Sequence, residues 1–311
     1  MIGRARAGLA LGALAALTAC APGPDPGHRA GSSDPTPAIA RARSDEVGAL
    51  RSYYARVEAD LVARGLLRTE AAPPDAPFDA RMLARNFEAI AFFSEYSEAG
   101  GRVEARRVAA PLRRWEEPVS IEIVFGRAVP DAQRRRDRAE IASLAQRIAG
   151  ATGLPISLGG ARPNLHIVVA DADDRQDTAW LRAAVPNLSE ATAREIARMP
   201  RGVYCMAYSF SSEPAPAVFT RAVVLIKDEQ PPLLRRACFH EEIAQAMGLS
   251  NDSLTARPSI FNDDEEFALL TRHDEMLLGM LYDPALRPGM TADAARPMLP
   301  ALAQAQMAGE S

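Results

Sequence analysis

The sequence predicts an α/β (α+β) fold in which a main domain of strands and helices follows helices near the N-terminus. Short runs of alternating apolar and polar residues, which are typical of strands, are separated by longer runs whose apolar residues recur at helical spacing. Of the 311 residues, 48% are hydrophobic and 24% are charged, the composition of an ordinary globular protein. The chain is long enough to build one large domain or two small ones with a sizeable core.

The first residues have the layout of a bacterial lipoprotein signal. Two arginines precede an apolar run over 7–17 that is too short to span a bilayer. The ending Leu17-Thr18-Ala19-Cys20 resembles the lipobox of bacterial lipoproteins, in which the cysteine receives acyl chains such as palmitate and becomes the new N-terminus. We therefore expect residues 1–19 to be a signal peptide and Cys20 to hold the mature chain on a membrane of the cell envelope, facing the periplasm. The alternative is an ordinary secretory peptide without lipidation.

The next segments predict a tether and a cap. Residues 20–44 are rich in Pro, Gly, Ser and Ala, a composition that favours a flexible tether. Ala21, instead of Asp, follows the cysteine, which by resemblance to enterobacterial sorting favours the outer membrane. Residues 45–112 predict a helical cap, with one helix over 45–68 and a second over 79–96 that ends at a Gly-Gly pair.

The main domain is predicted over 113–290, followed by a C-terminal tail over 291–311. Its predicted strands are 118–125, 155–158, 164–169, 203–211 and 218–227. Its predicted helices are 131–149, 177–199 with a break near Pro186, and 231–247. Proline suits the first turn of the last of these helices, and Gly248 suits its end.

Two cysteines remain once Cys20 carries lipid. In an oxidising periplasm, Cys205 and Cys238 predict a disulfide. Two buried thiols are the alternative, and a metal site fits less well because neither cysteine has a second one at ligand spacing. The formal charge of −4, with arginines and acidic residues interspersed, argues against a nucleic-acid partner.

The last long helix carries the motif of most interest. His240-Glu241 begins like the zinc motif H-E-x-x-H, but Ala244 occupies the second ligand position. Shifted by one residue, Glu242 and Gly248-Leu249 match the glutamate, glycine and leucine of H-E-x-x-H-x-x-G-L-x-H, the form found in metzincin metalloproteases. In that register the three ligand positions hold Glu241, Gln245 and Asn251.

Two later segments fit the same register. Residues 258–262 resemble the Met-turn of metzincins, with Phe261 in place of the methionine, and 270–282 resemble the closing helix. The resemblance covers about 118–284. It implies a metzincin-like (zincin) domain with a mixed sheet and an active-site-type helix.

The chain also resembles a closer family, proteobacterial lipoproteins known as domain of unknown function 2927. The motifs that carry this resemblance are Arg85-Asn86-Phe87, Glu95-Tyr96, Trp115, Glu241-Glu242 with Gln245, Gly248 to Asp252, and Ser259 to Asn262. It runs from about Asp45 to the C-terminus and brings no established activity.

The donor chemistry argues against a zinc enzyme. Catalytic zinc prefers nitrogen and sulfur ligands, so the oxygen donors of Glu241, Gln245 and Asn251 predict weak zinc binding. We expect no resident cofactor, with zinc or another divalent cation as the alternative. His240 would not share the ligand face, because neighbouring positions on a helix diverge by roughly 100 degrees.

The leading functional hypothesis is a noncatalytic lipoprotein, a pseudoenzyme whose protease-like cleft binds an envelope protein, peptide or glycan. The alternative is a divergent metal-dependent hydrolase in which Glu242 deprotonates a metal-bound water. Glu242 would otherwise pair with Arg235 or Arg236. The acidic run 263–266 predicts the start of a helix, and His273 and Asp274 predict packing and capping.

Overall fold

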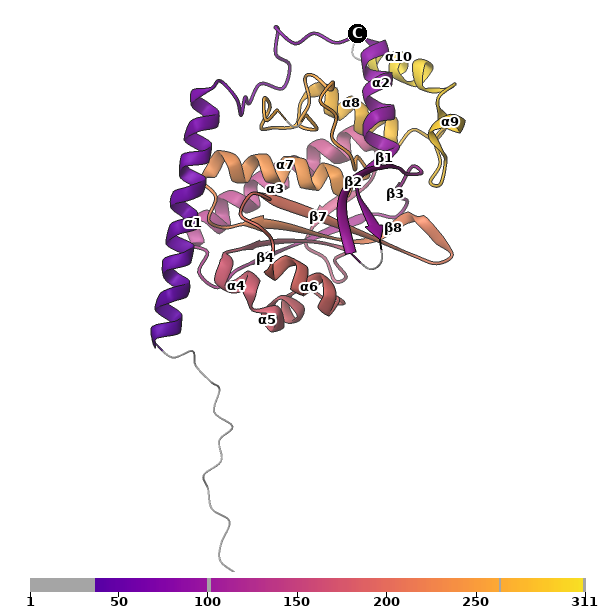
Figure 1. Cartoon of the computed structure of the whole chain (residues 1–311). Coiled ribbons are helices and arrows are strands. Elements are labelled where there is room, and N and C mark those ends of the chain that lie inside the picture. The colour runs from indigo at the N-terminus through magenta and orange to yellow at the C-terminus, as the bar shows by residue number, and fades with distance from the viewer. Residues whose placement is uncertain (1–36, 100–101, 263, 310–311) are drawn as a thin grey trace, which may run out of the picture.

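The computed structural model describes residues 37–99, 102–262 and 264–309 (Figure 1). The expected signal peptide and the lipidation site at Cys20 lie outside these described residues. In the described part, no helix combines the length and the apolar character that crossing a bilayer requires.

A mostly parallel sheet forms the centre of the fold and confirms the predicted α/β class. Its strands are β3 (Arg114–Trp115), β4 (Val119–Phe125), β5 (Ile156–Leu158), β6 (Leu165–Ala170), β7 (Cys205–Ser212) and β8 (Ala215–Lys227). The order is β3-β8-β6-β4-β5, and β7 pairs with β8 as an antiparallel edge strand. Every residue of β6 is buried, as expected for a parallel strand with both faces covered.

Helices cover both faces of this sheet (Figure 1). They are α3 (Asp131–Thr152) and α7 (Pro232–Ala246) on one face, and α4 (Ala172–Gln176), α5 (Thr178–Ala184) and α6 (Glu190–Ala197) on the other. Alternate residues of β6 enter different cores, because side chains alternate between the two faces of a strand. Ile167 lies in the core that contains α3 and α7, whereas Val168 packs with Leu181 of α5 and Ile196 of α6.

The first helix, α1 (Pro37–Ala63), lies along the end of the sheet where β8 finishes (Figure 1). It begins inside the segment 20–44 that was expected to be a tether. Tyr54 of α1 is fully buried and packs with Leu234 of α7 and Ala268. Helix α1 therefore belongs to the packed domain.

The segment after the second helix differs from the prediction. Helix α2 (Ala80–Ala91) ends before the expected residue 96, and β1 (Phe93–Ala99) and β2 (Arg102–Ala109) follow as an antiparallel pair. A Gly-Gly pair separates the two strands in the sequence, and such a pair between two strand-length segments favours a hairpin turn. The expected cap over 45–112 is thus not helical throughout.

Much of the segment 291–311, which was expected to be a C-terminal tail, is packed structure. Helices α9 (Ala292–Ala295) and α10 (Leu299–Ala308) bury Ala295, Leu299 and Ala303 in the main core. This core also contains the apolar faces of α2 and of α8 (Arg272–Leu281). Helices α1 and α2 accordingly pack against different parts of the domain (Figure 1).

Candidate functional site

Helix α7 is fixed at both ends and along its length. The backbone N–H of Leu234 in its first turn donates to Glu58 Oε2 of α1 at 2.8 Å. Near its end, the indole of Trp115 donates to the carbonyl of Ala246 at 2.8 Å. The predicted disulfide between Cys205 and Cys238 is confirmed and ties the start of β7 to α7.

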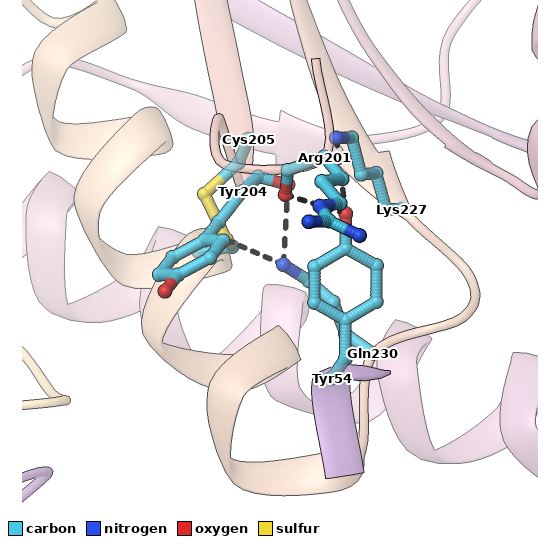
Figure 2. The surroundings of a disulfide bond; sticks show 7 residues. Tyr54, Arg201, Tyr204, Cys205, Lys227 and Gln230 are labelled. Atoms are coloured by element: carbon cyan, nitrogen blue, oxygen red, sulfur yellow. Dashed lines mark hydrogen bonds between the residues drawn. A yellow bond between two sulfur atoms is a disulfide. The ribbon is translucent and has the colours of Figure 1, made fainter. Parts of the chain in front are cut away.

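Gln230 braces this junction, as Figure 2 shows. Its side-chain amide donates to the carbonyl of Tyr204 at 3.1 Å and lies 3.4 Å from Cys238 Sγ. Strand β7 and α7 therefore hold a fixed position relative to one another.

Two carboxylates meet where α7 passes the start of β7. One oxygen each of Glu241 and Glu242 and the Cys205 sulfur all lie within 4.8 Å of one another. Glu242 is buried and Glu241 half-buried. Because Cys205 is bound in a disulfide, it has no thiolate to offer a metal. What remains is an acidic pair suited to holding a cation or a basic side chain.

A small pocket of about 100 Å³ opens beside Glu241. Oxygen-bearing side chains line one part of it, from Glu241, Asp252, Asn262 and Glu265. The rest is lined by Ala237, Ile260, Phe267 and Ala268. The pocket therefore favours a compact cationic group over a bulky apolar one.

The predicted ligand positions do not all reach this pocket. Asn251 is buried, and its amide donates to the carbonyls of Ala89 at 2.9 Å and Asp252 at 2.6 Å. Gln245 lies half-buried on α7 and does not line the pocket. Of the three positions, only Glu241 contributes to the lining.

His240 is held away from the acidic pair. Its Nδ1 accepts the Leu270 backbone N–H at 2.9 Å, so the ring proton lies on Nε2, which donates to Glu140 Oε1 at 3.0 Å. The hydrogen bond from His240 and the nearby Arg236 guanidinium hold the pKa of Glu140 at about 2. Burial lowers the pKa of His240 itself, so the imidazole is neutral and both nitrogens are occupied.

The arginines before His240 are engaged as well. Arg235 pairs with Asp137 at 3.2 Å, and Arg236 pairs with Glu140 at 3.1 Å. These contacts fasten α7 to α3 across the top of the sheet. They also account for the two basic residues that were considered as partners for Glu242.

A buried polar network fixes the loop below α7. Asp274 is fully buried and accepts hydrogen bonds from Thr271 N at 2.9 Å and Ser259 Oγ at 2.5 Å. Phe261, at the Met-turn-like position, is fully buried, and its N–H donates to Ser259 Oγ at 3.0 Å. His273 is also fully buried and lies 3.0 Å from the Asn86 amide. Packing and capping are thus the roles of His273 and Asp274, as predicted.

Residues 264–266 of the acidic run before this network do not start a helix, which corrects the prediction. Helix α8 begins at Arg272 because Thr271 and Asp274 form a reciprocal capping box there. Glu266 instead pairs with Arg257 at 2.6 Å and with Arg68 at 3.0 Å. Glu265 adopts a positive φ of 60° and lines the pocket beside Glu241. No local sequence signal predicts this placement.

Comparison with known proteins gives a family without an activity. A family model described as "Protein of unknown function (DUF2927)" matches residues 80–301, from α2 into α10. No curated protein matches the chain.

Proposed function

The chain belongs to the DUF2927 family, whose description assigns no activity. We propose that it is a noncatalytic, lipid-anchored protein of the cell envelope. In this proposal it binds an extended segment of a protein partner. The observation that carries this proposal is the chemistry around Glu241. Oxygen-bearing side chains line one part of the pocket beside it. The Asn251 amide donates to two backbone carbonyls, and both nitrogens of His240 form hydrogen bonds.

This donor set does not fit a resident zinc ion. Catalytic zinc sites use three protein ligands that are mostly imidazole or thiolate. The described residues near Glu241 offer no available imidazole, and the only nearby sulfur is in the disulfide. Calcium takes six to eight oxygen ligands, so the pocket's four oxygen-bearing side chains would reach that number only with bidentate carboxylates or added water.

The edge strand β7 supports an extended peptide as the partner. Among the described strands, β7 pairs with β8 alone, so no strand pairs with its other edge. An extended segment can add to such an edge through backbone hydrogen bonds, while pockets beside it read its side chains. Since the start of β7 lies next to Glu241 and Glu242, the acidic pair favours a lysine or arginine in the partner.

Metal analysis of the purified full chain tests the noncatalytic part of the proposal. We expect far less than one zinc per chain by inductively coupled plasma mass spectrometry after dialysis without chelator. Stoichiometric zinc that disappears in the double variant Glu241→Ala/Gln245→Ala would overturn it.

In-cell photo-crosslinking tests the partner. A photoreactive residue at Ser209 of β7 should give a discrete crosslinked product that weakens when Glu241→Gln and Asp252→Asn are added. The same residue at Ala191 of α6, on the other side of the sheet, is the matched control. Identical products from both positions would refute binding along β7.

Membrane attachment is tested separately. The variant Cys20→Ala should move the protein from the membrane fraction to the soluble fraction, and the mature wild type should carry an acylated Cys20 by mass spectrometry. Retention of the variant in the membrane would count against a lipid anchor at this position.

One observation favours a second candidate, a metal-dependent hydrolase with Glu242 as general base. Glu242 is buried and its carboxylate lies within 4.8 Å of a Glu241 oxygen, a placement in which two carboxylates can share a divalent cation and a proton. Metal-stimulated peptidase activity that is lost in Glu242→Gln but kept in Glu117→Gln would establish this candidate.

A further inference from the structure

A second and larger pocket lies between α2 and α10, away from the acidic pair. Its volume is about 450 Å³, within the range of small-molecule sites. The two helices that line it, α2 and α10, lie near the top of the view in Figure 1, far from the start of α1. Apolar groups of Ala84, Leu299 and Pro300 contribute to its lining. The pocket therefore suits a ligand with an aliphatic portion.

Two arginines that have no acidic partner among the described residues line this pocket. Arg81 and Arg85 lie one turn apart on α2, line the pocket and are both exposed. Neither makes a hydrogen bond or an ion pair with any described residue. Like charges at this helical spacing repel each other, so an anion between them would be stabilised.

The third arginine of the lining is already neutralised. Arg296 donates to Glu88 at 2.7 Å and to Asp293 at 2.7 Å. Glu88 is the only acidic residue in the lining, and Arg296 occupies both of its oxygens. No carboxylate of the lining is left for Arg81 or Arg85, and the pocket keeps a net positive charge.

The neighbours of Arg85 have structural roles that Arg85 lacks. Asn86 is buried against His273, and Phe87 is fully buried in the main core. Both point away from the solvent-facing side of α2. Arg85 points to the pocket instead, so the motif that it opens is only partly explained by packing.

We propose that this pocket binds a small anionic amphiphile, a monocarboxylate whose head group lies between Arg81 and Arg85 and whose aliphatic chain covers Ala84, Leu299 and Pro300. A carboxylate accepts two parallel hydrogen bonds from a guanidinium, which gives the head group a defined place. Each methylene removed from water strengthens binding about fourfold until the apolar surface is covered. The inference does not depend on the function proposed for α7, since the two sites share no residue.

Titration calorimetry of the full chain in phosphatidylcholine nanodiscs tests the proposal, with octanoate and decanoate as probes. We expect one site per chain, with decanoate about tenfold or more tighter than octanoate. The double variant Arg81→Gln/Arg85→Gln should weaken decanoate at least tenfold and leave the melting temperature unchanged, because neither side chain has a partner to lose. Arg182→Gln on α5 is the matched control and should bind like the wild type.

Two further arms make the assignment specific. Ala84→Trp, which fills the pocket and keeps both arginines, should also abolish binding. Decanol should bind at least tenfold more weakly than decanoate. Undiminished binding in either pocket variant, equal affinity for decanol, or no binding by the wild type would each overturn the proposal. Occupancy that appears only in phosphatidylglycerol nanodiscs would assign the arginines to a bilayer surface and overturn it as well.

Discussion

Replacing Lys227 with methionine should remove a specific pH dependence from the stability of the fold. Lys227 is the only lysine of the chain, and it ends β8 with 1% of its surface exposed. Its Nζ donates to the Tyr54 hydroxyl at 3.1 Å (Figure 2). It also donates to the Pro200 carbonyl at 2.7 Å. No carboxylate is among these partners, so burial lowers the pKa of Lys227 from 10.5 to about 7.

The sign of the effect follows from proton binding. Between pH 7 and pH 10.5 the unfolded chain keeps the lysine proton while the folded chain has lost it, so the free energy of unfolding rises with pH. The slope approaches about 1.4 kcal/mol per pH unit, which amounts to about 2 kcal/mol between pH 7.5 and 9. Below pH 7 both states are protonated and this contribution is constant at its least favourable value.

Urea denaturation of the wild type and Lys227→Met at pH 6, 7.5 and 9 measures the difference. The wild type should gain about 2 kcal/mol relative to the variant between the two higher values and nothing below pH 7. Lys227→Arg should be destabilised at every pH, because a guanidinium does not deprotonate. Since the chain has one lysine, the NMR signal of its labelled side chain reports the folded pKa directly. Parallel pH profiles for wild type and methionine variant, or a folded pKa near 10, would refute the reasoning.

Three further predictions concern the frame of the α7 site. Gly248→Ala should lower the free energy of unfolding by about 3 kcal/mol or more, because Gly248 has φ of +126° and an added Cβ would lie 2.1 Å from the Arg113 carbonyl oxygen. Gly150→Ala on α3, where the Cβ would meet nothing within 4 Å, is the control. Urea denaturation should show it to be neutral or slightly stabilising. The double variant Cys205→Ala/Cys238→Ala should lose about 2 to 4 kcal/mol, and reductant should destabilise the wild type but not the variant. Asp274→Asn should lower the melting temperature by several degrees, since the amide replaces a fully buried acceptor of hydrogen bonds from Ser259 and Thr271, while Asp293→Asn on the exposed α9 should change it little. A Gly248→Ala variant as stable as Gly150→Ala would contradict the close approach at the end of α7.

Much of the fold could be predicted because its signals are local. The alternation in 118–125 and the apolar run in 164–169 become β4 and β6, and the Pro-to-Gly limits of α7 are correct to within one or two residues. The two cysteines left for a disulfide do form one. The β1–β2 pair was missed because its first strand continues directly from α2, with only Phe92 between them.

The candidate site was less predictable because its parts come from distant segments. Glu265 reaches the pocket beside Glu241 through a left-handed turn, and Arg68 and Arg257 hold the neighbouring Glu266 in place. No periodicity or propensity encodes such contacts. The larger pocket likewise depends on the packing of α10 against α2, two helices at opposite ends of the matched region.

The residues that create the protease-like register have packing reasons to be where they are. Gly248 admits the Arg113 carbonyl where no side chain fits, Phe261 fills the core below α7, and Asn251 holds the end of α2 through the Ala89 carbonyl. A domain that binds no metal would need a small residue at position 248 and a buried apolar one at position 261 as much as a metalloenzyme does. The register by itself is therefore no evidence for zinc. The donor atoms argue against it, because the three ligand positions offer carboxylate and amide groups, while the imidazole of His240 is engaged by Glu140 and Leu270.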